Sequence, residues 1–171
     1  RQGGASTVLT VPTTGLASLR VNRQTILDLL EARQSFEISN AGLAAKKRTD
    51  EDLEAFRRIL ADMEAALDGS GSPDMEAEGE RTDLAFHRQL AAATHNSVLL
   101  TLFEAVSSQM ELAIRETRRA ELYANRAVAD RLLQEHAAIF EAVARGDAAA
   151  AEHAMREHLQ HVERMLMKHL Q

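Results

Sequence analysis

Apolar side chains recur every three or four residues along most of the chain, which is the pattern of amphipathic helices. The pattern predicts six helices: residues 22–47, 49–67, 75–93, 97 to at least 114, 124–145, and 148 to the end. Each has one apolar face, so each must be buried against its neighbours. The expected fold is all-α, an antiparallel bundle of six to seven helices joined by short loops.

Local signals mark several of the helix ends. Thr49 followed by Asp52 is typical of a capping box, and Asn96 or Ser97 is expected to cap the fourth helix. Gly146 ends the fifth helix and Asp147 caps the sixth. A stretch rich in glycine, serine and aspartate, DGSGSPD at 68–74, predicts a break between the second and third helices.

Residues 1–20 differ from the rest of the chain. They are rich in glycine, threonine and β-branched residues and contain Pro12, so they predict an extended strand and a linker. We therefore divide the chain into this segment and a helical domain at 21–171.

The composition narrows the class of protein. Hydrophobic residues make up 45% and charged residues 27% of the 171, as in a globular domain. Without cysteine there is neither a disulfide framework nor a thiolate metal site. The formal net charge of −6 does not favour nucleic-acid binding by this region. No apolar run approaches the roughly 18 residues that a membrane span requires. We expect a soluble, cytoplasmic domain.

Four side chains with metal-binding chemistry fall on the apolar faces of predicted helices: Asp83, His87, His136 and His158. An isolated charge is prohibitively costly to bury, whereas a divalent cation would satisfy a carboxylate and three neutral imidazoles together. Asp83 and His87 are four residues apart and emerge side by side from one helix. The sequence therefore predicts one metal site made from three helices.

Two plainer interpretations stay open. An inward histidine is often a hydrogen-bonded core residue, and Asp83 with His87 can be a local ion pair. The helical pattern also does not show that the three helices face one point. Two other helical metal architectures do not fit: no histidine has a glutamate three residues earlier, as di-iron bundles require, and no His-Asp doublet occurs.

Three segments resemble a known family. LLEARQSFEISNAGLAAKKRTDEDL from residue 29, TDLAFHRQLAAATHNSVL from residue 82 and EHAAIFEAVARGDAAAAEHAMREHL from residue 135 are similar to the FCD domain. This domain is the effector-binding half of FadR-type GntR transcriptional regulators. The resemblance covers about residues 22–170, and Asp83-x-x-x-His87 with two later histidines matches its metal-binding branch.

The resemblance implies a set of ligands. Asp83, His87, His136 and His158 would bind one divalent metal, most often zinc or nickel, with manganese or iron also possible. A small carboxylate effector would occupy positions left open on the metal. Two further positions match family elements that bind the effector. Arg33 follows Glu31 in the family's E-x-R element, its alternative role being an ion pair with Glu37, and Asn96 follows the third helix, its alternative role being a helix cap.

The first residues resemble a different part of these regulators. RQGGASTVL is similar to the end of a winged helix-turn-helix, although Ala5 and Ser6 replace the usual Gly-Thr. The base-reading helix would precede Arg1. We therefore expect residues 1–20 to be a wing remnant and linker, and operator binding to need an N-terminal domain absent from this chain.

The resemblance favours a sensor over the alternatives. A bound organic or sugar acid would bias how two protomers of a homodimer hold their DNA-binding domains. A metal-dependent, hydrolase-like enzyme would need a general base beside the metal, and Glu37 is the only inward candidate. A purely structural metal, or a metal that is itself the signal, is a third hypothesis. We expect no enzymatic activity.

Overall fold

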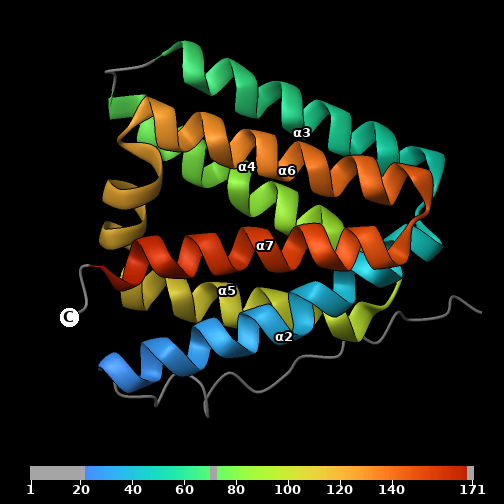
Figure 1. Cartoon of the computed structure of the whole chain (residues 1–171), viewed down its shortest axis with the longest axis horizontal. Helices are drawn as coiled ribbons and strands as arrows, with labels where there is room; N and C mark the ends of the chain where they lie inside the picture. The colour runs from blue at the N-terminus through green and yellow to red at the C-terminus, as the bar shows by residue number, and fades with distance from the viewer. Residues whose placement is uncertain (1–21, 70–72, 169–171) are drawn as a thin grey trace, which may run out of the picture.

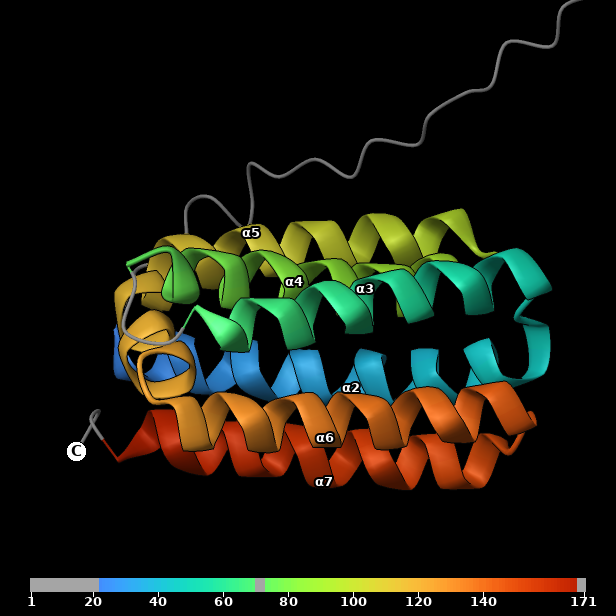
Figure 2. The same ribbon diagram turned by 90° about the horizontal axis from the view of Figure 1, so that it is seen from above.

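The structure is a computed structural model that describes residues 22–69 and 73–168. The wing remnant predicted at 1–20 lies outside the described residues. Helices follow one another along the rest of the chain: α2 (Arg23–Lys47), α3 (Asp50–Asp68), α4 (Pro73–Ala92), α5 (Ser97–Arg118), the π-helix η1 (Arg119–Tyr123), α6 (Arg126–Arg145) and α7 (Ala148–Met167). The long helices run side by side as a bundle (Figures 1 and 2), which confirms the predicted fold class.

The helix ends follow the predicted capping chemistry. Thr49 and Asp52 form both bonds of a capping box, and Asn96 accepts hydrogen bonds from two amides of the first turn of α5. Gly146 adopts a left-handed conformation with φ 72°, which favours glycine, and Asp147 then caps α7. Each cap satisfies amide groups that a helix end leaves unpaired.

The end of α5 was not predicted. Ile114 leaves helical geometry at φ −139° and ψ 20°, and the chain then passes into the π-helix η1. The amide of Ala124 donates to the carbonyl of Arg119, five residues earlier, at 3.1 Å. Tyr123 packs where a Cβ on Gly79 would lie 2.7 Å from its ring, so the glycine makes room for η1 against α4.

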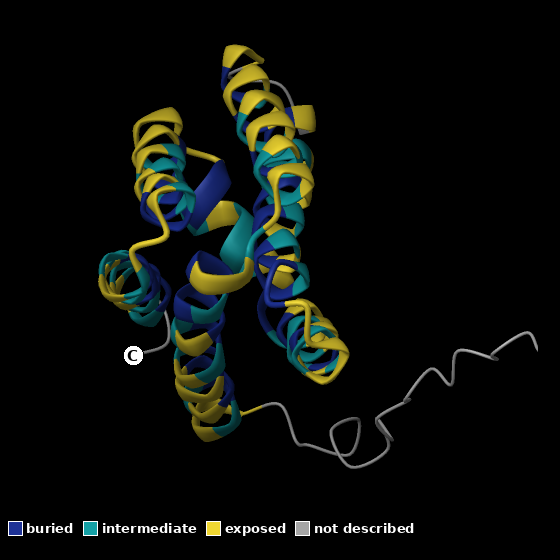
Figure 3. Cartoon of the chain, turned by 90° about the vertical axis from the view of Figure 1, so that its right-hand side faces the viewer, coloured by how far each residue is buried: buried dark blue, intermediate teal, exposed yellow. Residues whose placement is uncertain are grey.

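The buried faces of the helices point toward one another, and their exposed faces point outward (Figure 3). Two apolar clusters fill the interior. One, at the end where α2 meets α3, includes Ala41, Phe56, Phe86, Ile139, Val143 and Met155. The other, at the end where α2 begins, includes Ile26, Leu30, Ile114, Leu122, Tyr123 and Leu166.

A buried polar layer lies between the two apolar clusters along the helices. On α2, Arg33 and Glu37 come after Ile26 and before Ala41; on α6, His136 comes between Leu132 and Ile139. The layer is made of side chains that are at most 7% exposed: Arg33, Glu37, Asp83, His87, His136 and His158. The fold therefore concentrates its buried charge in one place.

One stretch, Ser97–Tyr123, is long and apolar enough by length and composition alone to cross a membrane, contrary to the expectation from the sequence. It packs against α2 and α4 within the bundle. Apolar side chains such as Leu102 and Leu112 are exposed along it, and its later turns carry Arg115 and Arg118. Core helices of soluble proteins meet the same criterion, so the finding is weak evidence for a membrane span.

Candidate metal centre and adjoining cavity

The four residues singled out in the sequence meet at one point in the polar layer. Ligand atoms of Asp83, His87, His136 and His158 all lie within 4.8 Å of one another, and all four residues are buried. Asp83 Oδ1 is 3.3 Å from His87 Nε2 and 3.0 Å from His136 Nε2. Helices α4, α6 and α7 thus place the four side chains at one common point, which the helical pattern alone did not show.

Two of the imidazoles are oriented by carboxylates on their outer side. His87 Nδ1 is hydrogen-bonded to Glu37 Oε1, and His158 Nδ1 lies 2.7 Å from Glu135 Oε1. A carboxylate only accepts, so Nδ1 carries the proton and Nε2 is directed into the cluster. This is the arrangement that fixes metal-binding histidines in proteins.

The third imidazole has a softer partner. His136 Nδ1 lies 3.2 Å from the sulfur of Met63, and its Nε2 lies 3.3 Å from His87 Nε2. A thioether is a weak acceptor, so His136 is positioned mainly by packing, including Phe86 at a ring-centroid distance of 4.7 Å.

The donor set fits a divalent cation. His158 Nε2 is buried and has no hydrogen-bond partner among the described residues, although it faces the other three ligands. A buried polar atom without a partner is costly, and the lone pair of a neutral imidazole is a good donor to zinc or nickel. Residues Asp83, His87, His136 and His158 are therefore able to hold one such ion.

Electrostatics differ across the cluster. Burial would raise the pKa of the Asp83 carboxyl, but His87 and His136 outweigh it and hold the pKa well below its ordinary value. Burial lowers the pKa of His136. Burial would also raise the pKa of Glu37, but Arg33 and His87 lower it to about 2. Glu37 is thus a permanent anion near neutral pH.

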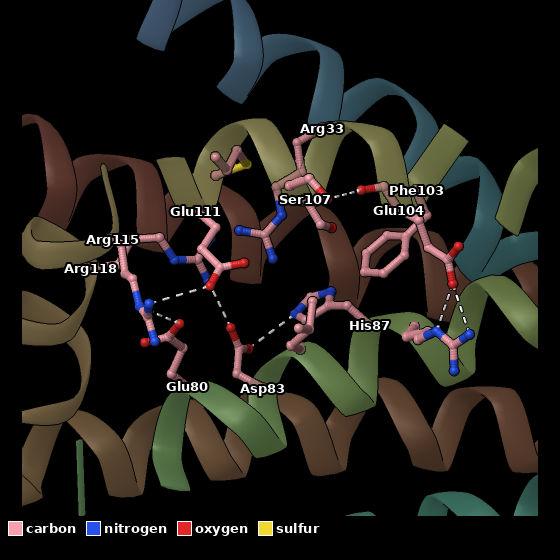
Figure 4. Close-up of a pocket in the computed structure, with 14 residues that line it drawn as sticks. Arg33, Glu80, Asp83, His87, Phe103, Glu104, Ser107, Glu111, Arg115 and Arg118 are labelled. Carbon is pink, nitrogen blue, oxygen red and sulfur yellow. Dashed lines mark hydrogen bonds and ion pairs between the residues drawn. The ribbon is translucent and has the colours of Figure 1, made fainter. Parts of the chain in front are cut away.

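A cavity of about 310 Å³ adjoins the cluster, between α2, α4 and α5 (Figure 4). Arg33 comes from α2, Asp83 and His87 from α4, and Phe103 with Arg118 from α5. Arg33 pairs with Glu37, which is the alternative role considered from the sequence, and it also lines this cavity. Its role in effector binding stays a prediction. The cavity thus reaches two of the candidate metal ligands, Asp83 and His87.

Asn96 lies elsewhere. Its side chain accepts hydrogen bonds from the amides of Val98 and Leu99 at 3.0 and 3.2 Å, and it is not among the residues that line the cavity. The capping role considered from the sequence is thus present. Its role in effector binding stays a prediction.

Two functional residues were missed in the sequence. Arg118 donates to Asp83 Oδ2 at 2.8 Å and lines the cavity, and Glu135 orients His158. Arg118 continues the inward stripe of Met110 and Ile114, so a charged residue on an apolar face was an available signal. Glu135 gave no such signal in the sequence, because its contact with His158 depends on how α6 packs against α7.

Relatives that are similar in sequence are named as regulators. The chain is 41% identical over 151 residues to the HTH-type transcriptional regulator LutR of Bacillus subtilis, a match covering 88% of this chain and 66% of LutR. It is 34% identical over 135 residues to the putative L-lactate dehydrogenase operon regulatory protein of Escherichia coli, covering 79% and 49%. The chain thus spans between about half and two thirds of these relatives.

Solved structures show the same architecture. Streptococcus agalactiae GntR matches with a TM-score of 0.72 and 24% identity over 96% of this chain and 72% of its own. Escherichia coli McbR/YncC matches with a TM-score of 0.76 and 15% identity over 89% and 68%. At these identities the likeness shows the fold.

The family itself is established by a match along most of the helical region. The FCD domain family matches residues 28–161, which include all four clustered ligands and the cavity. The names of the relatives agree with the expectation of a regulator rather than an enzyme. The chain belongs to the FCD domain family, found in GntR-type transcriptional regulators.

Proposed function

We propose that this chain is the effector-sensing domain of a GntR-type regulator, which binds one divalent metal and a small carboxylate. The observation that carries the proposal is the convergence of Asp83, His87, His136 and His158 beside a cavity lined by Arg33. Zinc or nickel is the expected ion, with manganese or iron as alternatives. A cation held there supplies positive charge next to the cavity.

The effector is expected to be an organic or sugar acid. Arg33 is 7% exposed and offers a planar guanidinium that matches a carboxylate. The volume of about 310 Å³ is at the small end of ligand pockets, which suits lactate, pyruvate, glycolate, citrate or a sugar acid. One relative is named as a putative L-lactate dehydrogenase operon regulatory protein, in keeping with an organic acid.

Regulation would follow from binding. The domain is proposed to act in the cytoplasm as a homodimer, with operator DNA bound by a winged helix-turn-helix domain N-terminal to the helical region. A ligand changes operator affinity only through its different affinity for the two arrangements of the dimer. Asn96 is left out of this proposal because its side chain is occupied by the cap of α5.

A purely structural metal is the second candidate, and the complete burial of the four ligands favours it. The adjoining cavity argues for sensing, since a structural site is usually closed. A metal-dependent enzyme is less well supported, because Glu37, with a pKa of about 2, is too weak a base.

The metal is tested first. Protein purified without a nickel column or chelator is analysed for metals, and about one ion per chain is expected. A ratio near zero that added zinc does not raise would overturn the metal site. It would leave the four residues as a hydrogen-bonded core cluster.

Carboxylate binding is tested next on the metal-loaded protein, by calorimetric titration with L-lactate, citrate and D-glucuronate. At least one is expected to bind, and Arg33→Ala is expected to weaken that binding about tenfold or more while the metal stays bound. Indifference of the wild type to all three would favour the structural metal. Equal affinity in the variant would remove Arg33 from the binding site.

A further inference from the structure

The two carboxylate oxygens of Asp83 have different partners. Oδ1 faces His87 and His136, whereas Oδ2 accepts a hydrogen bond from Arg118 at 2.8 Å. The Arg118 side chain is 13% exposed and lines the cavity together with Arg33. Figure 4 shows the guanidinium groups and Asp83 around the same space. Arg118 therefore contacts both a candidate metal ligand and the cavity.

The guanidinium groups of the buried Arg33 and of Arg118, which is 13% exposed, pair with carboxylates that would each keep another contact without them. Glu37 pairs with Arg33 but is also bonded to His87. Asp83 pairs with Arg118 through Oδ2, and a cation held among Asp83, His87 and His136 would satisfy its Oδ1. An anion in the cavity can thus take over the guanidinium groups without leaving a carboxylate buried and unpaired, which would be the main cost of such an exchange.

The charge of the site favours this exchange. In the buried layer, Arg33 and Arg118 are balanced by Glu37 and Asp83. A divalent cation among neutral histidines leaves the layer positively charged, so an anion is needed. Asp83 would also share its charge with a cation at Oδ1, which weakens its hold on Arg118 through Oδ2.

Arg118 lies where the backbone departs from regular geometry. It is the last residue of α5, four residues after the break at Ile114 and directly before η1. Irregular helical turns of this kind are often found at functional sites. Tyr123, at the end of η1, is 4% exposed, and its hydroxyl has no hydrogen bond of good geometry within the described part of the chain.

The same segment contacts the beginning of the helical region. Ile114, Leu122 and Tyr123 belong to the apolar cluster that contains Ile26 and Leu30 of the first turns of α2. Figure 1 shows η1 and the start of α2 at the same end of the bundle. A movement of η1 therefore reaches the residues where α2 begins.

We propose that Arg118 is a second effector-binding residue, and that a bound anion draws it from Asp83 and so shifts η1 against the start of α2. The inference rests on the proposed function and names a residue that acts in it. It assigns two guanidinium groups to the effector, Arg33 from α2 and Arg118 from α5. It also proposes that η1 couples the cavity to the end of the bundle where α2 begins.

The chain carries its own probe for this movement. Tyr123 is the single tyrosine, and there is no tryptophan, so intrinsic tyrosine fluorescence reports on η1 alone. The metal-loaded full chain is titrated with whichever of L-lactate, citrate and D-glucuronate binds it by calorimetry, and both heat and fluorescence are recorded. Metal content is measured on the same samples.

Three variants are compared with the wild type. Arg118→Gln removes the charge and Arg118→Lys keeps it. Arg115→Gln is the matched control, because Arg115 lines the same cavity one turn earlier but is 44% exposed and pairs with Glu80 and Glu111. We expect Arg118→Gln to weaken binding of the probe about tenfold to a hundredfold, with an intermediate loss for Arg118→Lys and less than about threefold for Arg115→Gln.

Fluorescence separates binding from coupling. The probe is expected to change the Tyr123 signal in the wild type and in Arg115→Gln, and to leave it unchanged in Arg118→Gln even at saturation. Unchanged affinity in Arg118→Gln would overturn the binding role, and a silent Tyr123 in the wild type would overturn the coupling. Loss of the metal from both Arg118 variants would reduce Arg118 to a support for Asp83. A wild type that holds metal but binds no probe would reject the proposed function itself.

Discussion

His87 and His158 stand on two sides of the same cluster, both buried and both with a carboxylate at Nδ1, yet their pKa values shift in opposite directions. Burial lowers the pKa of each. For His87, Glu37 and Asp83 outweigh burial and raise it. For His158, the neighbouring His136 adds to burial, and the bond to Glu135 only partly offsets them, so the pKa falls to about 3.

The difference comes from the charges that surround each imidazole. His87 lies beside two buried carboxylates, Glu37 and Asp83, whose combined effect exceeds both burial and the opposing charge of Arg33. Glu135 is 19% exposed and lies 2.8 Å from His161 and 3.2 Å from Arg131, so its charge is shared and screened by water. A carboxylate at Nδ1 thus gives two electrostatic outcomes, which depend on how deeply that carboxylate is buried and on the other charges of the cluster.

The strongest test of this comparison removes each carboxylate in turn. Glu37→Gln leaves Arg33 buried without its anion, so we expect a loss of about 3–5 kcal/mol in the free energy of unfolding. Glu135→Gln, the matched control, should cost about 1 kcal/mol, because Glu135 is itself 19% exposed and its partner Arg131 reaches water. Chemical denaturation of the metal-free proteins measures both. Equal losses would contradict the distinction between a dry and a wet side.

Removing a candidate ligand tests whether the two sides of the cluster hold one metal ion together. His136→Ala is expected to weaken metal binding by more than about a hundredfold, beyond the effect of losing an outer partner, and to lower the melting temperature of metal-loaded protein. The control is His153→Ala, because His153 is exposed on the same bundle. Metal content after dialysis and a thermal melt check the pair. If His136→Ala kept its metal, His136 would not be a ligand.

A smaller effect is expected in the pH dependence of the metal-free protein. The pKa of His158 is lower in the folded than in the unfolded chain, so its contribution makes stability fall as pH drops from about 6.5 toward 3. The pKa of His87 is raised, so the stability it contributes is present below pH 6.5 and is lost as pH rises through its folded pKa.

The slope of unfolding free energy against pH tests these signs. His158→Gln should flatten the loss between pH 6.5 and 3, whereas His87→Gln should flatten the loss above pH 6.5. Denaturant melts across this range provide the measurement. Slopes that change in the same direction in both variants would refute the opposite shifts.

Much of this arrangement could be read from the sequence, because it depends on local rules. Helix faces, the capping box at Thr49 and the left-handed Gly146 follow from short stretches of chain. The same faces marked Asp83, His87, His136 and His158 as inward. Their common point depends on how α4, α6 and α7 cross, which no single helix specifies.

Other features depended on contacts between distant segments. Glu135 reaches His158 only because α6 and α7 pack together, and η1 exists beside Gly79 because α4 leaves room for Tyr123. Arg118 was missed for a different reason. It follows the stripe of Met110 and Ile114 in the sequence, but the apolar residues that defined the fourth helix ended at Ile114, where the backbone also leaves helical geometry.

The polar layer between the two apolar clusters also fixes the alignment of the helices. A slip of α6 by one turn would move His136 about 5.4 Å along the axis and bring an apolar residue to the cluster instead. Asp83 would then lose His136 as a partner and His158 on α7 would lose Glu135, whereas the apolar clusters alone would tolerate such a slip far better. The residues of the candidate site thus help to specify how the helices align along their axes, so correct packing of the helices also assembles the site.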